Sequence, residues 1–161
     1  MQPAFVAHIF AACRELGVHT ALDTSGNLGA RASDALLDDT DLVLLDVKSG
    51  LAETYWNVTT RELAPTVAFG DRLAGRGNRM WIRFVLVPGL TDAYDNVEAV
   101  ADIVAAWPTV DRVEVLPFHQ MGSSKWERLG VPYTLADTRP PDDTLQERVR
   151  GQFRSRGLTV W

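Results

Sequence analysis

Opposite charges stand two residues apart at the end of one predicted strand, at Asp46 and Lys48. The apolar residues before them, 42–45, are typical of a strand that is buried on both faces within a parallel sheet. Because side chains alternate across a strand, the carboxylate of Asp46 and the ammonium of Lys48 are expected on the same side. The carboxyl ends of strands hold the chemistry of α/β folds, so this pair indicates a ligand site. An exposed ion pair that merely ends a strand is the alternative interpretation.

Two further predicted strands also bring polar side chains toward their ends. The strand predicted at residues 18–22 leads into Asp23 and Thr24. The apolar run at residues 80–87 is interrupted by Arg83. A lone arginine in a buried strand is destabilising unless it has a partner or a ligand, which favours a binding role for Arg83. Asp23 has a structural alternative, because it can cap the helix that follows.

A fourth strand is predicted at residues 113–116, and its exit carries His119, which can also be a hydrogen-bonded structural histidine. Residues 50–61 and 120–139 are expected to be loops. Apolar residues at helical spacing predict helices that begin near Pro3, Ala32, Pro65, Thr91 and Asp142. Strand and helix therefore alternate four times, which implies a parallel sheet with right-handed crossovers. We expect five ionisable side chains to converge on one rim of this sheet: Asp23, Asp46, Lys48, Arg83 and His119.

The composition is that of a globular protein with one domain over residues 1–161: 46% of the residues are apolar, 23% are charged and the net charge is −5. The acidic balance argues against a nucleic-acid partner. No apolar stretch approaches the length of a membrane span, so we predict no membrane partner and a cytoplasmic location. The one cysteine, Cys13, lies on the apolar stripe of the first predicted helix and is expected to be buried in the core.

Four segments carry a further pattern in unbroken order. They are residues 21–27 (ALDTSGN), 41–49 (DLVLLDVKS), 81–92 (WIRFVLVPGLTD) and 114–126 (EVLPFHQMGSSKW). Together these segments closely resemble pyruvate formate-lyase activating enzymes, which are radical S-adenosylmethionine (SAM) enzymes. The compatible spacing of four separate blocks makes the resemblance specific, and it extends from about Gln2 to the C-terminus.

This resemblance implies an α/β fold, a partial (β/α) barrel whose parallel sheet holds about four of the six β/α units of the family barrel. It also implies a [4Fe-4S] cluster and SAM at the carboxyl rim. Such enzymes reductively cleave SAM to a 5′-deoxyadenosyl radical, which removes a hydrogen atom from a glycine of a partner. The implied partner is pyruvate formate-lyase or a related glycyl-radical enzyme.

Carried over position by position, the resemblance implies two groups of site residues. The residues that bind SAM are Asp46, Lys48, Arg83 and His119. The residues around a monovalent cation beside the SAM carboxylate are Asp23, Thr24 and Asp46, with a backbone carbonyl near Leu44. SAM carries a carboxylate, an amine and a positive sulfonium, so it requires protein groups of both signs, as this set provides.

The chain departs from the family at the iron–sulfur site, because the CxxxCxxC motif and the Gly-Gly-Glu segment after it are absent. We therefore expect this chain to correspond to the C-terminal two thirds of such an enzyme, with a missing N-terminal fragment as a further partner. Cys13 alone cannot replace three thiolates, so the chain is expected to be inactive by itself. A smaller departure is Thr60, at a position where the family usually has glycine.

Two other functions stay open. The chain can be a non-enzymatic remnant that binds SAM-like ligands or a protein partner. It can also be an ordinary lyase or aldolase in which Lys48 forms a Schiff base with a carbonyl substrate.

Overall fold

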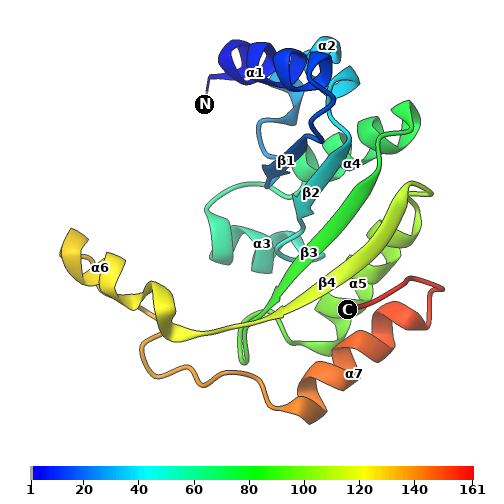
Figure 1. The fold of residues 1–161 in the computed structure, drawn as a ribbon. Helices are drawn as coiled ribbons and strands as arrows, with labels where there is room; N and C mark the ends of the chain where they lie inside the picture. The colour runs from blue at the N-terminus through cyan, green and yellow to red at the C-terminus, as the bar shows by residue number, and fades with distance from the viewer. Residues whose placement is uncertain (1) are drawn as a thin grey trace.

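The computed structural model describes residues 2–161 as an α/β fold built on a four-stranded parallel sheet (Figure 1). Each strand pairs with its neighbour in the sequence, so the spatial order is β1-β2-β3-β4. The strands are β1 (Ala21–Thr24), β2 (Leu42–Asp46), β3 (Met80–Leu86) and β4 (Val110–Pro117). The predicted parallel sheet is confirmed. The C-terminal segment adds one isolated parallel bridge to the sheet, between Val160 and Val113.

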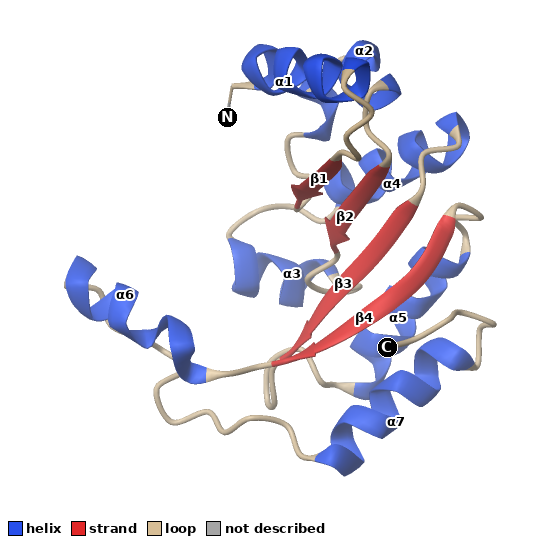
Figure 2. Ribbon diagram, viewed as in Figure 1, coloured by secondary structure: helices blue, strands red, loops and turns tan. Residues whose placement is uncertain are grey.

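Seven α-helices and two 3₁₀ turns precede, connect and follow the strands of the described chain (Figure 2). Five of the helices match predicted ones: α1 (Pro3–Glu15), α2 (Asp34–Asp38), α4 (Ala64–Arg76), α5 (Tyr94–Ala105) and α7 (Asp143–Arg154). The loop predicted at residues 50–61 is wrong, because it contains α3 (Ala52–Thr59). The loop predicted at 120–139 is wrong in its first part, which folds into η2 (Gln120–Gly122) and α6 (Ser123–Leu129). The other 3₁₀ turn is η1 (Gly29–Arg31).

The hydrophobic core lies between the sheet and three helices, α4, α5 and α7, which cover one face (Figure 2). Residues alternate along β3, so that Met80, Ile82, Phe84 and Leu86 are buried against these helices. The rings of Phe84 and Phe153 meet edge to face, with centroids 5.8 Å apart. The intervening residues of β3 are only half-buried and define the opposite face, which we call the open face of the sheet.

The prediction that residues 42–45 are buried on both faces is wrong for Leu44, which is half-buried on the open face. Val43 and Leu45, which point to the helices, are completely buried. A run of apolar residues does not distinguish a strand buried on two faces from one that also carries a partly exposed apolar residue. The open face begins at this residue and continues into Asp46.

α1 lies outside the core, and none of the residues Pro3–Glu15 is buried. Cys13 is half-buried, so its predicted place in the core is wrong. Phe5 and Ile9, on the same predicted stripe, are exposed by 61% and 42%. The helix packs beside α2 and borders a hollow of about 410 Å³ that also touches Leu22 and Phe69. The apolar stripe of α1 is therefore partly exposed in the described structure.

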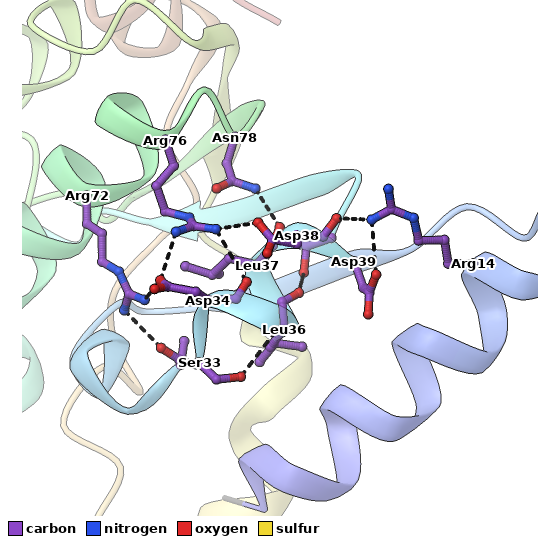
Figure 3. Close-up of polar contacts among 12 residues, drawn as sticks. Arg14, Ser33, Asp34, Leu36, Leu37, Asp38, Asp39, Arg72, Arg76 and Asn78 are labelled. Atoms are coloured by element: carbon purple, nitrogen blue, oxygen red, sulfur yellow. Dashed lines mark hydrogen bonds and ion pairs between the residues drawn. The ribbon is translucent and has the colours of Figure 1, made fainter.

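Ion pairs connect α2 and the residue after it to α4 and α1 (Figure 3). These contacts lie at the end of the sheet opposite the carboxyl ends of the strands. Asp34 accepts from Arg72 at 2.6 Å and from Arg76 at 2.8 Å, both on α4. Arg14 of α1 reaches Oδ1 of Asp39, just after α2, at 3.0 Å. The side chain of Ser33 caps α2 by accepting the N–H of Leu36, as expected at a helix start. Within residues 2–161, no helix combines the length and apolar character needed to cross a bilayer.

Candidate functional site on the open face of the sheet

Charged side chains form a row across the open face of the sheet. Asp46 on β2 is paired directly with Arg83 on β3, and Arg83 is paired with Glu114 on β4. Residues paired in a ladder project to the same face, so a carboxylate, a guanidinium and a second carboxylate follow one another across three strands. This row is perpendicular to the strands, and no single strand carries it.

Arg83 binds two carboxylates at once. Its Nε donates to Oδ1 of Asp46 at 3.0 Å, and its Nη2 donates to Oδ1 of Asp23 at 2.8 Å. Lys48 Nζ donates to the second oxygen of Asp46, Oδ2, at 2.9 Å. The predicted same-side arrangement of Asp46 and Lys48 is therefore confirmed. These contacts form one continuous chain of ion pairs, Asp23–Arg83–Asp46–Lys48, which joins β1, β2 and β3.

The pKa of Arg83 is raised above its ordinary value by this surrounding. Burial favours the neutral form and lowers the pKa, but the hydrogen bond and charge of Asp46 outweigh it, and Asp23 adds to their effect. The Asp46 side chain is only 14% exposed and that of Arg83 is 22% exposed, so water screens this pair less than a surface pair. The guanidinium is therefore positively charged at neutral pH.

The site lies on the open face near the carboxyl ends of β1 and β2, because Asp46 is the last residue of β2 and Asp23 is the last but one of β1. Asp23, Asp46 and Arg83 all belong to strands, and only Lys48 follows the end of its strand. The strand predicted at residues 18–22 lies at Ala21–Thr24 in the structure, so Asp23, which was expected after the strand, lies within it. Asp46 and Arg83 are paired directly, and the long side chains of Arg83 and Lys48 reach the carboxylates of Asp23 and Asp46 from other positions along the strands.

His119 stands apart from this chain of ion pairs. It is exposed, and its Nδ1 accepts the backbone N–H of Met121 at 3.3 Å. Within residues 2–161 it forms no hydrogen bond or ion pair with the four charged site residues. The hydroxyl of Thr24 accepts the N–H of Gly26 at 3.0 Å, and Leu44 lies on β2 in direct register with Asp23. The structure thus joins four of the expected residues and leaves His119 and Thr24 to local contacts.

A hollow of about 480 Å³ opens beside Lys48. Its lining is mainly apolar and comes from α3, the exit of β3 and the segment around α6. Val85 and Phe118 contribute from the strand ends, and Trp126 and Tyr133 contribute a stacked aromatic pair with centroids 5.7 Å apart. An apolar hollow with one ammonium at its edge suits a ligand that has a flat ring and a charged end.

Two charged residues of this face were missed from the sequence, Arg112 and Glu114. They form an ion pair of 2.5 Å, and the guanidinium carbon of Arg112 lies 3.4 Å from the ring centroid of Trp81. Their period-two spacing on β4 is a signal that they share a face. The sequence alone shows this spacing, but nothing in the sequence indicates that this face is open.

The residues of this chain do not fit a [4Fe-4S] cluster. Its one cysteine, Cys13, lies on α1, and such clusters require several convergent thiolates. Among residues 2–161 there is no group of three or more His, Cys, Asp or Glu side chains placed to hold a metal ion. The carboxylates of Asp23 and Asp46 could accept a monovalent cation, but both share Arg83 as their partner in this conformation.

No family model matches this chain. It is 35% identical over 162 residues to "Pyruvate formate-lyase 1-activating enzyme" of Escherichia coli (strain K12), an alignment that covers 99% of this chain and 66% of that protein. It is 36% identical over 149 residues to "Pyruvate formate-lyase-activating enzyme" of Clostridium pasteurianum, covering 92% of this chain and 62% of that protein. The chain thus spans slightly less than two thirds of the length of these relatives.

Solved structures support the fold. The crystal structure of a domain of pyruvate-formate lyase-activating enzyme from Bacteroides vulgatus matches with a TM-score of 0.82 at 20% identity, covering 99% of this chain and 90% of that chain. A radical SAM methyltransferase from Sphaerobacter thermophilus matches with a TM-score of 0.65 at 16% identity, covering 91% of this chain and 41% of that one. The expected α/β fold, a partial barrel on a parallel sheet, is confirmed. From its sequence relatives, this chain belongs to the family of pyruvate formate-lyase activating enzymes.

Proposed function

We propose that this chain is the SAM-binding part of an enzyme that activates a glycyl-radical enzyme. The observation that carries the proposal is the ion-pair chain Asp23–Arg83–Asp46–Lys48 on the open face. These two cations and two carboxylates lie within hydrogen-bond distance of one another. The cations suit the carboxylate of the methionyl end of SAM, and the carboxylates suit its amine and sulfonium. SuiB of Streptococcus suis, whose structure is described as bound to S-adenosylmethionine, has a similar fold, with a TM-score of 0.67 at 15% identity.

In this proposal the SAM carboxylate binds Lys48 and Arg83, whose planar guanidinium can donate two parallel hydrogen bonds. The SAM amine and sulfonium are balanced by Asp46. These protein charges already pair with one another without the ligand, so binding exchanges internal ion pairs for pairs with SAM. The net gain is therefore smaller than the sum of the new contacts.

The adenosyl end of SAM takes the apolar hollow beside Lys48 in this proposal. Val85 and Phe118 provide contact surface for a flat ring, and His119 follows Phe118 directly in the sequence. His119 is exposed and so is free to turn toward a ligand. A ligand of this kind spans from Arg83 on the open face to the end of β4.

We also propose a monovalent cation beside the SAM carboxylate, held by Asp23, Thr24, Asp46 and the carbonyl of Leu44. Support comes from the pair of carboxylates, whose Oδ1 atoms both contact the Arg83 guanidinium. A cation that binds there competes with Arg83 for the same oxygens. Its arrival would free Arg83 for the ligand carboxylate, so cation and SAM are expected to bind cooperatively.

The whole enzyme's activity requires more than this chain. The thiolates for the iron–sulfur cluster are not in its sequence, so we propose that a separate cluster-binding part must supply them. The macromolecular partner is pyruvate formate-lyase or a related glycyl-radical enzyme. Iron and sulfide analysis after anaerobic reconstitution should find no stoichiometric cluster on the isolated chain. An intact cluster on this chain would overturn this part of the proposal.

Isothermal titration calorimetry with SAM tests the binding function. The wild-type chain should bind with a Kd on the order of millimolar, because the cluster that would chelate the methionyl group is missing. Arg83→Met and Lys48→Met should each weaken binding by roughly tenfold, the effect of losing one charged hydrogen bond. Lys125→Met, at an exposed lysine on α6, is the matched control and should change nothing. Equal affinity in all four proteins would refute the proposed site.

A further inference from the structure

A buried polar cluster joins the loop after β2 to α5. Its members Ser49, Thr91 and Asn96 are 0%, 2% and 0% exposed. The side-chain oxygen of Asn96 accepts three hydrogen bonds from the loop: from Ser49 Oγ at 2.6 Å and from the N–H groups of Gly50 and Leu51 at 3.0 and 3.4 Å. Because these donors follow Lys48 directly, one side chain of α5 fixes the backbone next to Lys48.

The same cluster continues to the exit of β3. The amide nitrogen of Asn96 donates to the carbonyl of Thr91 at 2.7 Å. The hydroxyl of Thr91 donates to the carbonyl of Val85 at 2.9 Å and accepts the N–H of Val87 at 2.8 Å. Asn96 therefore lies in the middle of a hydrogen-bonded path that links the end of the strand of Asp46 to the end of the strand of Arg83.

The loop after β2 is pressed tightly against α5, which fixes its distance from Asn96. A Cβ atom on Gly50 would lie 2.3 Å from the backbone nitrogen of Val100 and 2.5 Å from the carbonyl carbon of Ala99. Both atoms are backbone of α5 and cannot move aside, so only glycine fits here. The contact leaves no room for the loop to shift toward the helix, and the three hydrogen bonds to Asn96 oppose a shift away from it.

Lys48 lies just beyond β2, and this arrangement holds the backbone on both sides of it. Before it, the N–H of Val47 donates to the carbonyl of Arg83 at 3.1 Å, and after it comes Ser49. The Lys48 ammonium stands at the end of a flexible chain of four carbons. Its position therefore depends on how firmly the backbone at Lys48 is held. Its distance of 2.9 Å to Asp46 Oδ2 depends on that placement.

We infer that Asn96 is a positioning residue of this site: through Ser49, Gly50 and Leu51 it sets the Lys48 ammonium against Asp46 and hence against a bound ligand. Asn96 itself is completely buried, and the hydrogen bonds of its side chain go to this loop and to Thr91, so its effect on Lys48 passes through the loop. The inference adds a positioning residue to the proposed SAM site. It rests on the proposed SAM binding only for the titration described below, because the labelling experiment needs no ligand.

Amine labelling tests the inference without any ligand. The sequence contains two lysines, Lys48 and the exposed Lys125, so each protein carries its own reference. The ratio of their acylation rates with acetic anhydride is read by mass spectrometry. An ammonium held by a carboxylate reacts more slowly than one in water. Asn96→Ala should therefore raise the Lys48/Lys125 ratio by roughly threefold to tenfold, the factor expected when about 1 kcal/mol of ordering is lost.

Two further variants separate positioning from general loosening. Asn78→Ala removes a comparable side-chain hydrogen bond, from Asn78 Nδ2 to the carbonyl of Leu37 at 2.9 Å, at the other end of the sheet. It should leave the Lys48/Lys125 ratio unchanged. Ser49→Ala removes one donor to Asn96 and should raise the ratio in the same direction by less, which keeps the test valid where Asn96→Ala fails to fold. A ratio unchanged in Ser49→Ala and Asn96→Ala, or raised equally in Asn78→Ala, overturns the inference.

SAM titration supplies a second readout through a double-mutant cycle. Asn96→Ala should weaken SAM binding several-fold in the wild-type background and have no further effect in Lys48→Met, because its influence passes through Lys48. Additive losses would show that Asn96 acts elsewhere and overturn the inference. Absence of SAM binding by the wild type would instead refute the proposed function, and the labelling ratio would still decide whether Asn96 positions Lys48.

Discussion

Asp46 on β2 and Arg83 on β3 occupy directly paired positions of the parallel ladder, and Nε of Arg83 lies 3.0 Å from Oδ1 of Asp46. The second oxygen of the same carboxylate holds Lys48 at 2.9 Å. One half-buried acid is therefore the common acceptor for two cations from different elements. The site is organised around Asp46, whereas Asp23 adds a more exposed contact at its edge.

Asp46→Asn should destabilise the fold more than Asp23→Asn. The amide keeps the shape of the side chain but leaves Lys48 without its negative partner and Arg83 with Asp23 alone, at a cost of about 1–3 kcal/mol for a partly buried pair. Asp23 has a side chain that is 57% exposed, so its pair with Arg83 should contribute less than about 1 kcal/mol. Urea unfolding of both variants measures the difference, and the reverse order would contradict the central place of Asp46.

Thr60→Gly should stabilise the protein by about 1 kcal/mol, because Thr60 has a left-handed backbone that suits a β-branched residue poorly. Its φ and ψ are 54° and 30°, and it ends α3 by donating its N–H to the carbonyl of Trp56. Thr59→Gly is the matched control. It removes a hydroxyl that donates to the carbonyl of Tyr55 at 2.7 Å, and it should lower the melting temperature. A lower melting temperature for Thr60→Gly would contradict the assignment of strain.

The sequence was sufficient for the parallel sheet and five helices, because their apolar periodicity reflects contacts with one core. Prediction from the sequence failed for segments whose secondary structure or buried face depends on tertiary packing. In α3, Tyr55 is 1% exposed and bonds to Thr66 at 2.7 Å, yet the segment shows no regular apolar period. In α4, Phe69 is a core side chain whereas the adjacent apolar residue Ala68 is exposed. A shift of one residue on a helix cannot be resolved from a short apolar run.

The site was predictable in its residue types and less so in its geometry. Strand alternation placed Asp46 and Lys48 together correctly, but it could not show that Arg83 bridges Asp46 and Asp23 across three strands. Pairing between strands depends on register, which a sequence pattern leaves open. One feature of the sequence weakly indicates the role of Asn96. It precedes Val100 by four residues, which places this polar side chain on the buried apolar stripe of α5.

Acid should destabilise the fold through the cluster at Arg156. Hydrogen bonds from Arg156 hold the pKa of Glu98 and of Asp102 below their ordinary values, and burial opposes this only in part. Because the folded pKa is depressed, this stabilisation is complete above the unfolded pKa of about 4 and is lost as the pH falls through the folded pKa.

The urea midpoint should therefore be nearly constant from pH 7 to about 5 and fall below about pH 4. The double variant Glu98→Gln, Asp102→Asn should show a shallower fall over the same range, because neither amide titrates. Identical acid profiles for the wild type and this variant would show that the cluster does not contribute.

The isolated chain should self-associate through the edge of β1. The carbonyl of Thr20 accepts the N–H of Leu42, so the alternate residues Ala21 and Asp23 direct their backbone groups away from β2. An unpaired edge is a template for another strand. Size-exclusion chromatography with light scattering should detect species larger than the monomer at micromolar concentration.

Ala21→Pro should reduce that association, since it removes an outward N–H at the first position of the strand. Ile9→Ser, at an exposed apolar residue of α1, tests the other candidate surface. A monomeric wild type, or association that only Ile9→Ser abolishes, would show that the β1 edge is not the contact.

The most direct test of the SAM site is an NMR titration of the isotopically labelled chain with SAM. Binding on the open face predicts saturable shifts at Asp46, Lys48, Arg83 and His119, including the Arg83 side-chain Nε–H, with a Kd on the order of millimolar. The amides of α2, at the opposite end of the sheet, should stay unchanged. Shifts confined to the hollow between α1 and β1, or no shifts at SAM concentrations of about 5 mM, would contradict the proposed site.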